Sequence, residues 1–146
     1  MREILFRGKS VDSNYFTYGY LIKLGNRYGI TDKCISILDG VYHNFEVREV
    51  IPETIGQYTG MIDSNNNKIF EGDIISIPFE EDRSPYESPV FHHENGVIYF
   101  DDSRHGWYVR FADSDEISIW EFDDRDVLVI GNIHDNPELL NGDKKI

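Results

Sequence analysis

Hydrophobic and polar residues alternate with period two along most of the chain, and Gly, Asn and Asp interrupt the alternation at short intervals. This pattern is typical of antiparallel strands that bury one face. Between residues 106 and 111, Trp107, Val109 and Phe111 share one face, while Tyr108 and Arg110 share the other. A shift by one residue would bury Arg110, so the register is well specified. The pattern predicts strands at residues 3–7, 16–24, 28–30, 34–38, 45–51, 57–58, 73–79, 96–100, 106–111, 116–122 and 127–131.

Turn residues separate these strands and join them into hairpins. Hairpin turns need positive φ angles or short polar tips, and they are predicted at residues 25–26, 39–40, 63–67 and 101–106. Helix is predicted only for one turn each at 52–55 and 136–140, where Pro and Glu stand in the first turn. Two prolines and four acidic residues predict a loop at 80–89.

The length of 146 residues and a hydrophobic content of 40% predict one folded domain. We expect a mainly β fold of antiparallel hairpins with a small SH3-like barrel and minor short helices. The N-terminal β part covers about residues 1–60, and the small barrel covers about residues 61–140.

A net charge of −13 disfavours direct binding of nucleic acid, because the chain as a whole repels phosphate. The apolar run at the N-terminus is too short for a signal peptide, and no stretch approaches the roughly 20 apolar residues of a membrane-spanning helix. We therefore expect a cytoplasmic protein without membrane attachment.

Residues that could carry chemistry do not form a recognised catalytic or metal-binding motif. The five histidines lack an HExxH pattern, and no GxSxG or phosphate-binding glycine motif is present. The single cysteine, Cys34, is followed by the aliphatic residues Ile35, Ile37 and Leu38, which predicts a buried strand thiol. The sequence therefore predicts no catalytic residue, no metal ligand and no cofactor.

Aromatic residues are abundant, at 9 Phe, 9 Tyr and 2 Trp. They exceed what one small core can bury, and exposed aromatic side chains concentrate the energy of protein interfaces. We expect a homo-oligomer and name as candidate interface residues Tyr18, Tyr20, Tyr58, Trp107, Tyr108 and Trp120.

Three segments share a pattern with a known family. They are residues 2–9 with 18–21, residues 50–60 with 63 and 68–75, and residues 129–140. In this order they resemble the strands and motifs of the YopX family, which occurs largely in phages and prophages of Gram-positive bacteria. The resemblance implies a mainly β protein of phage origin that self-associates in the cytoplasm of the bacterial host cell. It also implies a family with no established biochemical activity, which offers no catalytic residues to transfer. Its glycines suit turns, which favours a role of the motifs in folding.

These observations favour a self-associating module that binds a host or phage protein, or regulates it, and is not an enzyme. A first alternative is an acidic DNA mimic that inhibits a nucleic-acid-binding protein of the host, motivated by the charge of −13. A second alternative is a metal-dependent hydrolase that would use Asp101, Asp113 or Asp115.

Overall fold

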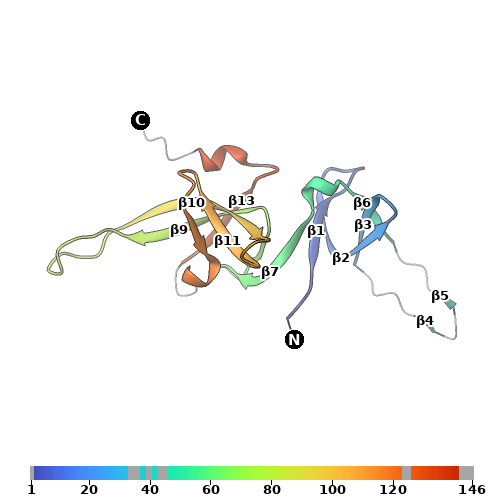
Figure 1. Ribbon diagram of the computed structural model, residues 1–146, viewed down its shortest axis with the longest axis horizontal. Coiled ribbons are helices and arrows are strands. Elements are labelled where there is room, and N and C mark those ends of the chain that lie inside the picture. The colour runs from blue at the N-terminus through green and yellow to red at the C-terminus, as the bar shows by residue number, and fades with distance from the viewer. Residues whose placement is uncertain (1, 33–36, 39–40, 43–45, 123–125, 142–146) are drawn as a thin grey trace. The chain divides into compact units, whose positions relative to one another are not determined.

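The computed structural model describes residues 2–32, 37–38, 41–42, 46–122 and 126–141. The chain divides into two compact units, Met1–Gly60 and Met61–Ile146. Both are built from antiparallel strands, which confirms the expected mainly β fold (Figure 1). The elements are β1 (Phe6–Lys9), β2 (Phe16–Leu24), β3 (Arg27–Thr31), β4 (Ile37–Leu38), β5 (Val41–Tyr42), β6 (Arg48–Val50), η1 (Pro52–Thr54), β7 (Gly56–Ile62), β8 (Lys68–Phe70), β9 (Asp73–Glu80), β10 (Phe91–Asp101), β11 (Gly106–Phe111), β12 (Glu116–Ser118), η2 (Ile119–Phe122), β13 (Leu128–Asn132) and η3 (Pro137–Leu140).

The first unit is a sheet in the order β6-β3-β2-β1-β7. The predicted turn after β2 forms at Gly25, whose φ of 64° is the left-handed conformation that glycine adopts without strain. Ile30 and Val50 are almost completely buried. Gly8 lies against Val50, because a Cβ at this position would come within 3.0 Å of the Val50 Cβ. The absence of a side chain at Gly8 therefore lets two chain segments approach closely.

The short helix η1 confirms the turn predicted at 52–55 and ties β1 to the segment that follows β6. The Thr54 hydroxyl accepts a hydrogen bond from the Lys9 backbone N–H at 2.8 Å. The same hydroxyl donates to the Ile51 carbonyl at 2.6 Å. Residues 50–60, which belong to the segments that resemble the YopX family, therefore contribute to the packing of the first unit.

The second unit contains a five-stranded sheet in the order β12-β11-β10-β9-β13. The hairpin of β10 and β11 has the predicted register, with Phe100 opposite Trp107 and Ile98 opposite Val109. Burial of alternate residues confirms the predicted faces, because Val109 is buried while Arg110 is exposed. The core consists of Ile69, Ile75, Ile77, Ile98, Val109, Phe111, Ile119, Phe122 and Val127.

The expected SH3-like barrel is not confirmed, because the sheet is open. Its edges are β12 and β13, which do not pair with each other in the described part of the chain. The strand predicted at 116–122 ends at Ser118, and the chain continues as the 3-10 helix η2. A 3-10 helix brings residues three apart to the same side, and Ile119 and Phe122 both enter the core. The chain that was predicted to continue as a strand therefore contributes to the core as a short helix.

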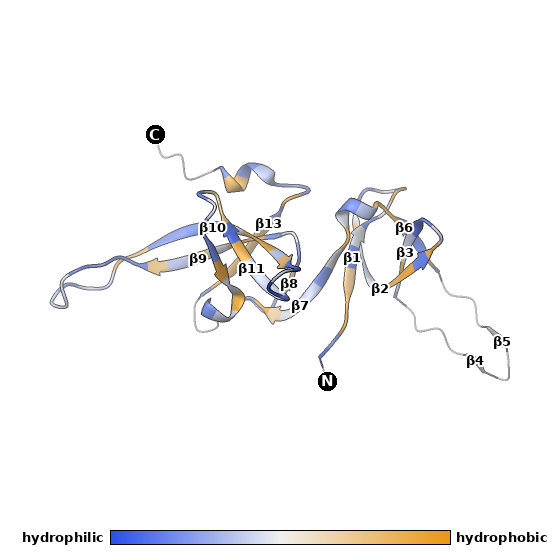
Figure 2. Cartoon of the chain, in the orientation of Figure 1, coloured by the Kyte–Doolittle hydropathy of each residue, from blue (hydrophilic) through white to orange (hydrophobic). Residues whose placement is uncertain are grey.

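Other strands also differ from the sequence prediction. β1 was predicted at residues 3–7 and forms at Phe6–Lys9, and β7 was predicted at residues 57–58 and extends over Gly56–Ile62. β8 pairs in a hairpin after the predicted polar tip at 63–67, although its three residues were too few to show alternation. β10 begins at Phe91, five residues earlier than predicted, so β9 and β10 form a long hairpin (Figure 1). Its connecting loop at 81–90 is hydrophilic, as predicted from the sequence (Figure 2).

Some predictions fall on residues that the structure does not describe. Cys34 and the turn at 39–40 lie outside the described residues, as do His43 and the acidic residues 123–124. No helix among the described residues combines the length and the hydrophobicity needed to cross a membrane.

Candidate functional site

The six candidate interface residues divide equally between the two units. Tyr18, Tyr20 and Tyr58 lie in the first unit, and Trp107, Tyr108 and Trp120 lie in the second. Each unit is therefore considered as a separate surface.

In the first unit, β2 presents a row of large apolar and aromatic side chains, here called the β2 stripe. Alternate residues of a strand point to the same face, so the stripe consists of Phe16, Tyr18, Tyr20, Ile22 and Leu24. Tyr18 and Tyr20 are 48% and 46% exposed, and Leu24 is also exposed. Such a continuous apolar row on an exposed sheet face is typical of a protein-binding surface.

The N-terminal end of the β2 stripe is held in place by cations of β1. The Phe16 ring lies 4.5 Å from the Arg7 guanidinium carbon and 5.5 Å from the Lys9 ammonium. Both cations belong to residues that are nearly buried. Such cation–π contacts fix the ring, and an immobilised aromatic side chain loses less conformational entropy when it binds a partner.

Tyr58 differs from the two tyrosines of β2. Its side chain is only 8% exposed, and burial raises the pKa of its hydroxyl. Little of Tyr58 is available to a partner in this conformation, so its contribution in the structure is to the packing of the first unit.

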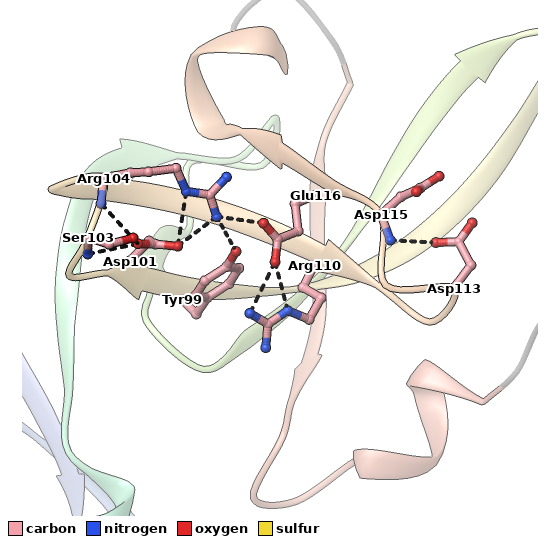
Figure 3. Close-up of polar contacts among 8 residues, drawn as sticks. All are labelled: Tyr99, Asp101, Ser103, Arg104, Arg110, Asp113, Asp115 and Glu116. Atoms are coloured by element: carbon pink, nitrogen blue, oxygen red, sulfur yellow. Dashed lines mark hydrogen bonds and ion pairs between the residues drawn. The ribbon is translucent and has the colours of Figure 1, made fainter.

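In the second unit, Tyr99, Arg104 and Arg110 lie close together on β10, β11 and the turn between them (Figure 3). Together with Tyr108 and Glu116 they form a group that is here called the Tyr–Arg face. Tyr99 and Tyr108 stand opposite each other, with ring centres 6.2 Å apart. The Arg104 guanidinium lies 3.8 Å from the centre of the Tyr108 ring, and Arg110 lies 4.2 Å from that of Tyr99. Glu116 of β12 accepts hydrogen bonds from Arg104 at 2.5 Å and from Arg110 at 3.1 Å.

The charges of the Tyr–Arg face satisfy one another. Hydrogen bonds from Ser103 and Arg104 hold the pKa of Asp101 well below its usual range. The hydrogen bond from Arg104 likewise lowers the pKa of Glu116, and the two carboxylates raise the pKa of Arg104. These groups stay charged and paired at neutral pH, so the Tyr–Arg face is a closed network with little unused capacity for a ligand.

The side chains of Trp107 and Trp120 differ in exposure. Trp107 is half-buried and packs edge to face against Phe100, with ring centres 5.1 Å apart. Trp120 lies in η2 and is 73% exposed. Of the three candidates in the second unit, Trp120 therefore offers the largest free aromatic surface.

The carboxylates considered for a hydrolase do not come together. Asp101 stands at the end of β10 and binds Ser103 and Arg104, whereas Asp113 and Asp115 follow the opposite end of β11 (Figure 3). Asp113 accepts a hydrogen bond from the Asp115 backbone N–H at 3.0 Å. Among the described residues, no group of three or more His, Cys, Asp or Glu side chains is arranged to hold a metal ion.

In the segments that resemble the YopX family, Asp63 and Gly131 stabilise turns and strand ends. Asp63 is buried and accepts hydrogen bonds from the backbone N–H groups of Asn65, Asn67 and Val129. Burial opposes ionisation, but these hydrogen bonds prevail and lower the pKa of Asp63. In the closing motif, Asn136 and Leu139 pack so tightly over Gly131 that a Cβ there would lie 2.6 Å from the Asn136 amide oxygen.

The fold and the surfaces define the class of this protein. It is a mainly β chain of two units, its sequence motifs form turns and strand ends, and exposed aromatic residues lie on its surface. The family model described as YopX protein matches residues 5–141, and the chain belongs to the YopX family. Among solved structures, the chain is similar to the crystal structure of protein EF1440 from Enterococcus faecalis. The identity is 26%, the TM-score is 0.56, and the match covers 96% of this chain and 99% of that chain. No curated protein matches the sequence.

Proposed function

We propose that the protein is a phage-encoded, non-enzymatic binding module of the bacterial cytoplasm that associates with a second copy of itself through the β2 stripe. The observation that carries this proposal is the row of five large side chains on one face of β2, with Tyr18 and Tyr20 about half exposed. Two such faces can pack as stacked sheets, about 10 Å apart. The same surface would serve both copies in a two-fold symmetric contact.

The distribution of charge supports the first unit as the self-association surface. The first unit contains seven Lys and Arg against seven Asp and Glu, whereas the second contains seven against twenty. The whole excess of −13 is therefore in the second unit. Two second units repel each other, but two first units carry no net charge that would oppose contact.

The test compares a double variant of the β2 stripe with a control in the second unit. We expect the wild-type protein to sediment as a dimer or larger at micromolar concentration, and Tyr18→Ser with Tyr20→Ser to sediment as a monomer. Circular dichroism checks that the double variant is folded. The control is Tyr86→Ser, which removes a tyrosine that is 95% exposed in the second unit. A monomeric wild type, or an unchanged assembly of the double variant, would contradict the proposal.

A second candidate function is supported by the charge of the second unit. Twenty carboxylates against seven cations create a field that attracts basic protein surfaces, including the surface with which a nucleic-acid-binding protein holds its phosphates. An inhibitor of this DNA-mimicking kind would bind a host protein with an affinity that falls steeply as salt increases. Contact through the β2 stripe is apolar and would depend little on salt, so a salt titration separates the two functions.

A further inference from the structure

The first unit contains a cleft of about 380 Å³ at the N-terminal end of the β2 stripe, with Phe16 and Tyr18 of the stripe in its lining. Its volume lies in the range of small-molecule sites. The lining combines three hydroxyl side chains, three aromatic rings and three charged groups, and comprises Ser10, Ser13, Tyr15, Phe16, Thr17, Tyr18, Ile30, Asp32, Glu46 and Arg48. All of these residues belong to the first unit, so this cleft is formed without the second.

The charged groups of the cleft do not form ion pairs with one another. Asp32, Glu46 and Arg48 take part in no side-chain hydrogen bond or ion pair with another described residue. In the neighbouring strands, by contrast, Arg27 and Glu49 form a direct ion pair. Two acceptors and one donor group with several N–H bonds are therefore available to a ligand in the cleft.

The chemistry of the lining selects among ligand classes. A phosphate would meet two carboxylates and only one guanidinium. An ammonium cation would be attracted by the carboxylates, but it only donates hydrogen bonds and would leave the N–H groups of Arg48 without an acceptor. A purely apolar ligand would leave the carboxylates and hydroxyls desolvated without partners. A neutral ligand with many hydroxyl groups avoids all three penalties.

A sugar ring also suits the aromatic residues of the cleft. Its C–H face is weakly positive and apolar, whereas the face of a tyrosine ring carries negative charge density. Tyr15 is among the most exposed tyrosines of the first unit and stands at the cleft, next to the half-buried Phe16. We infer that this cleft binds a short neutral saccharide, with Tyr15 stacking on a ring and Asp32, Glu46 and Arg48 binding its hydroxyl groups.

The experiment is a titration of the full-length protein followed by NMR. The probes are the neutral oligosaccharides maltotriose, cellotriose and N,N′,N″-triacetylchitotriose, with inorganic phosphate and lysine as separate arms. We expect saturable shifts with at least one oligosaccharide, confined to signals of residues 10–48. Loss of one stacking ring in Tyr15→Ala, or of one charged acceptor in Asp32→Asn, is expected to weaken binding about tenfold.

Tyr86→Ala is the matched control, because this exposed tyrosine belongs to the second unit and is not among the residues that line the cleft. This variant should bind the oligosaccharide with the affinity of the wild type. The inference is overturned if no oligosaccharide binds at millimolar concentration, if phosphate or lysine binds in its place, or if Tyr15→Ala binds normally. Sedimentation of the same samples reports self-association separately. Tyr15 and Asp32 are not part of the β2 stripe. If no saccharide binds, the sedimentation result therefore still tests the proposed self-association.

Discussion

The two units use their charges differently. In the second unit, the exposed arginines of the sheet are bound by Asp101 and Glu116, and a closed network of ion pairs covers the aromatic rings. In the first unit, positive and negative charges are equal in number. Asp32, Glu46 and Arg48 line a cleft there, and they form no ion pair or side-chain hydrogen bond with any residue that the structure describes. A dense cluster of functional groups on a sheet can therefore be structural, whereas fewer groups that do not pair with one another are better placed for binding.

The largest effect is expected from the core of the second unit. Ile98→Ala removes a fully buried side chain and should lower the free energy of unfolding by about 2–5 kcal/mol. The control Ile98→Val should cost only about 0.5–1.5 kcal/mol. Both tryptophans of the chain lie in the second unit, so urea unfolding followed by tryptophan fluorescence reports on this unit alone. Equal midpoints for the two variants would contradict the assignment of this core.

A smaller effect is expected from the buried turn at Asp63. Asp63→Ala leaves the backbone N–H groups of Asn65, Asn67 and Val129 without their acceptor, which should cost about 1–3 kcal/mol. The folded pKa of Asp63 is lowered, so its stabilisation is present above the unfolded value of about 3.9 and is lost as pH falls through the folded pKa.

The pH dependence gives a second readout for the same residue. Thermal melts of the wild type should lose stability below about pH 4, where the unfolded chain takes up protons more readily than the folded chain. Asp63→Asn should show a weaker loss over this range, because it has no carboxylate to titrate. The same acid sensitivity in the wild type and in Asp63→Asn would show that other groups dominate.

The smallest effect is expected on the Tyr–Arg face. Arg104→Ala should lower the melting temperature only slightly, because ion pairs at an exposed surface are screened by water. This small loss should diminish further at high salt, and Arg83→Ala, which breaks one exposed ion pair with Glu87 in the loop at 81–90, serves as the control. A loss as large as that of Ile98→Ala would show that the network holds the second unit together.

Local pattern explains how much of the fold the sequence could predict. The hairpin of β10 and β11 follows from alternation and turn residues alone, and its register places Tyr99 opposite Tyr108. The segment 116–122 shows where pattern fails. Its alternation fits a strand, but Ile119 and Phe122 also fit the period of a 3-10 helix, and only tertiary packing decides between the two.

The surfaces were predictable to a different degree. Exposure of Tyr18 and Tyr20 agrees with their place on β2, but burial of Tyr58 depends on neighbours from other parts of the chain. The position of Arg104 over Tyr108 depends on how the turn after β10 folds back, which alternation does not encode. The cleft lies between segments around residues 10–18, 30–32 and 46–48, and no local motif joins these segments.

We propose that copies of the protein meet through the first unit. Hydroxyl-radical footprinting at low and high protein concentration tests it directly, because oxidation reports the exposure of individual aromatic side chains. We predict that Tyr18 and Tyr20 become protected as concentration rises, while Tyr86 and Trp120 remain equally reactive. Protection of Trp120 with unchanged reactivity of Tyr18 and Tyr20 would contradict the account.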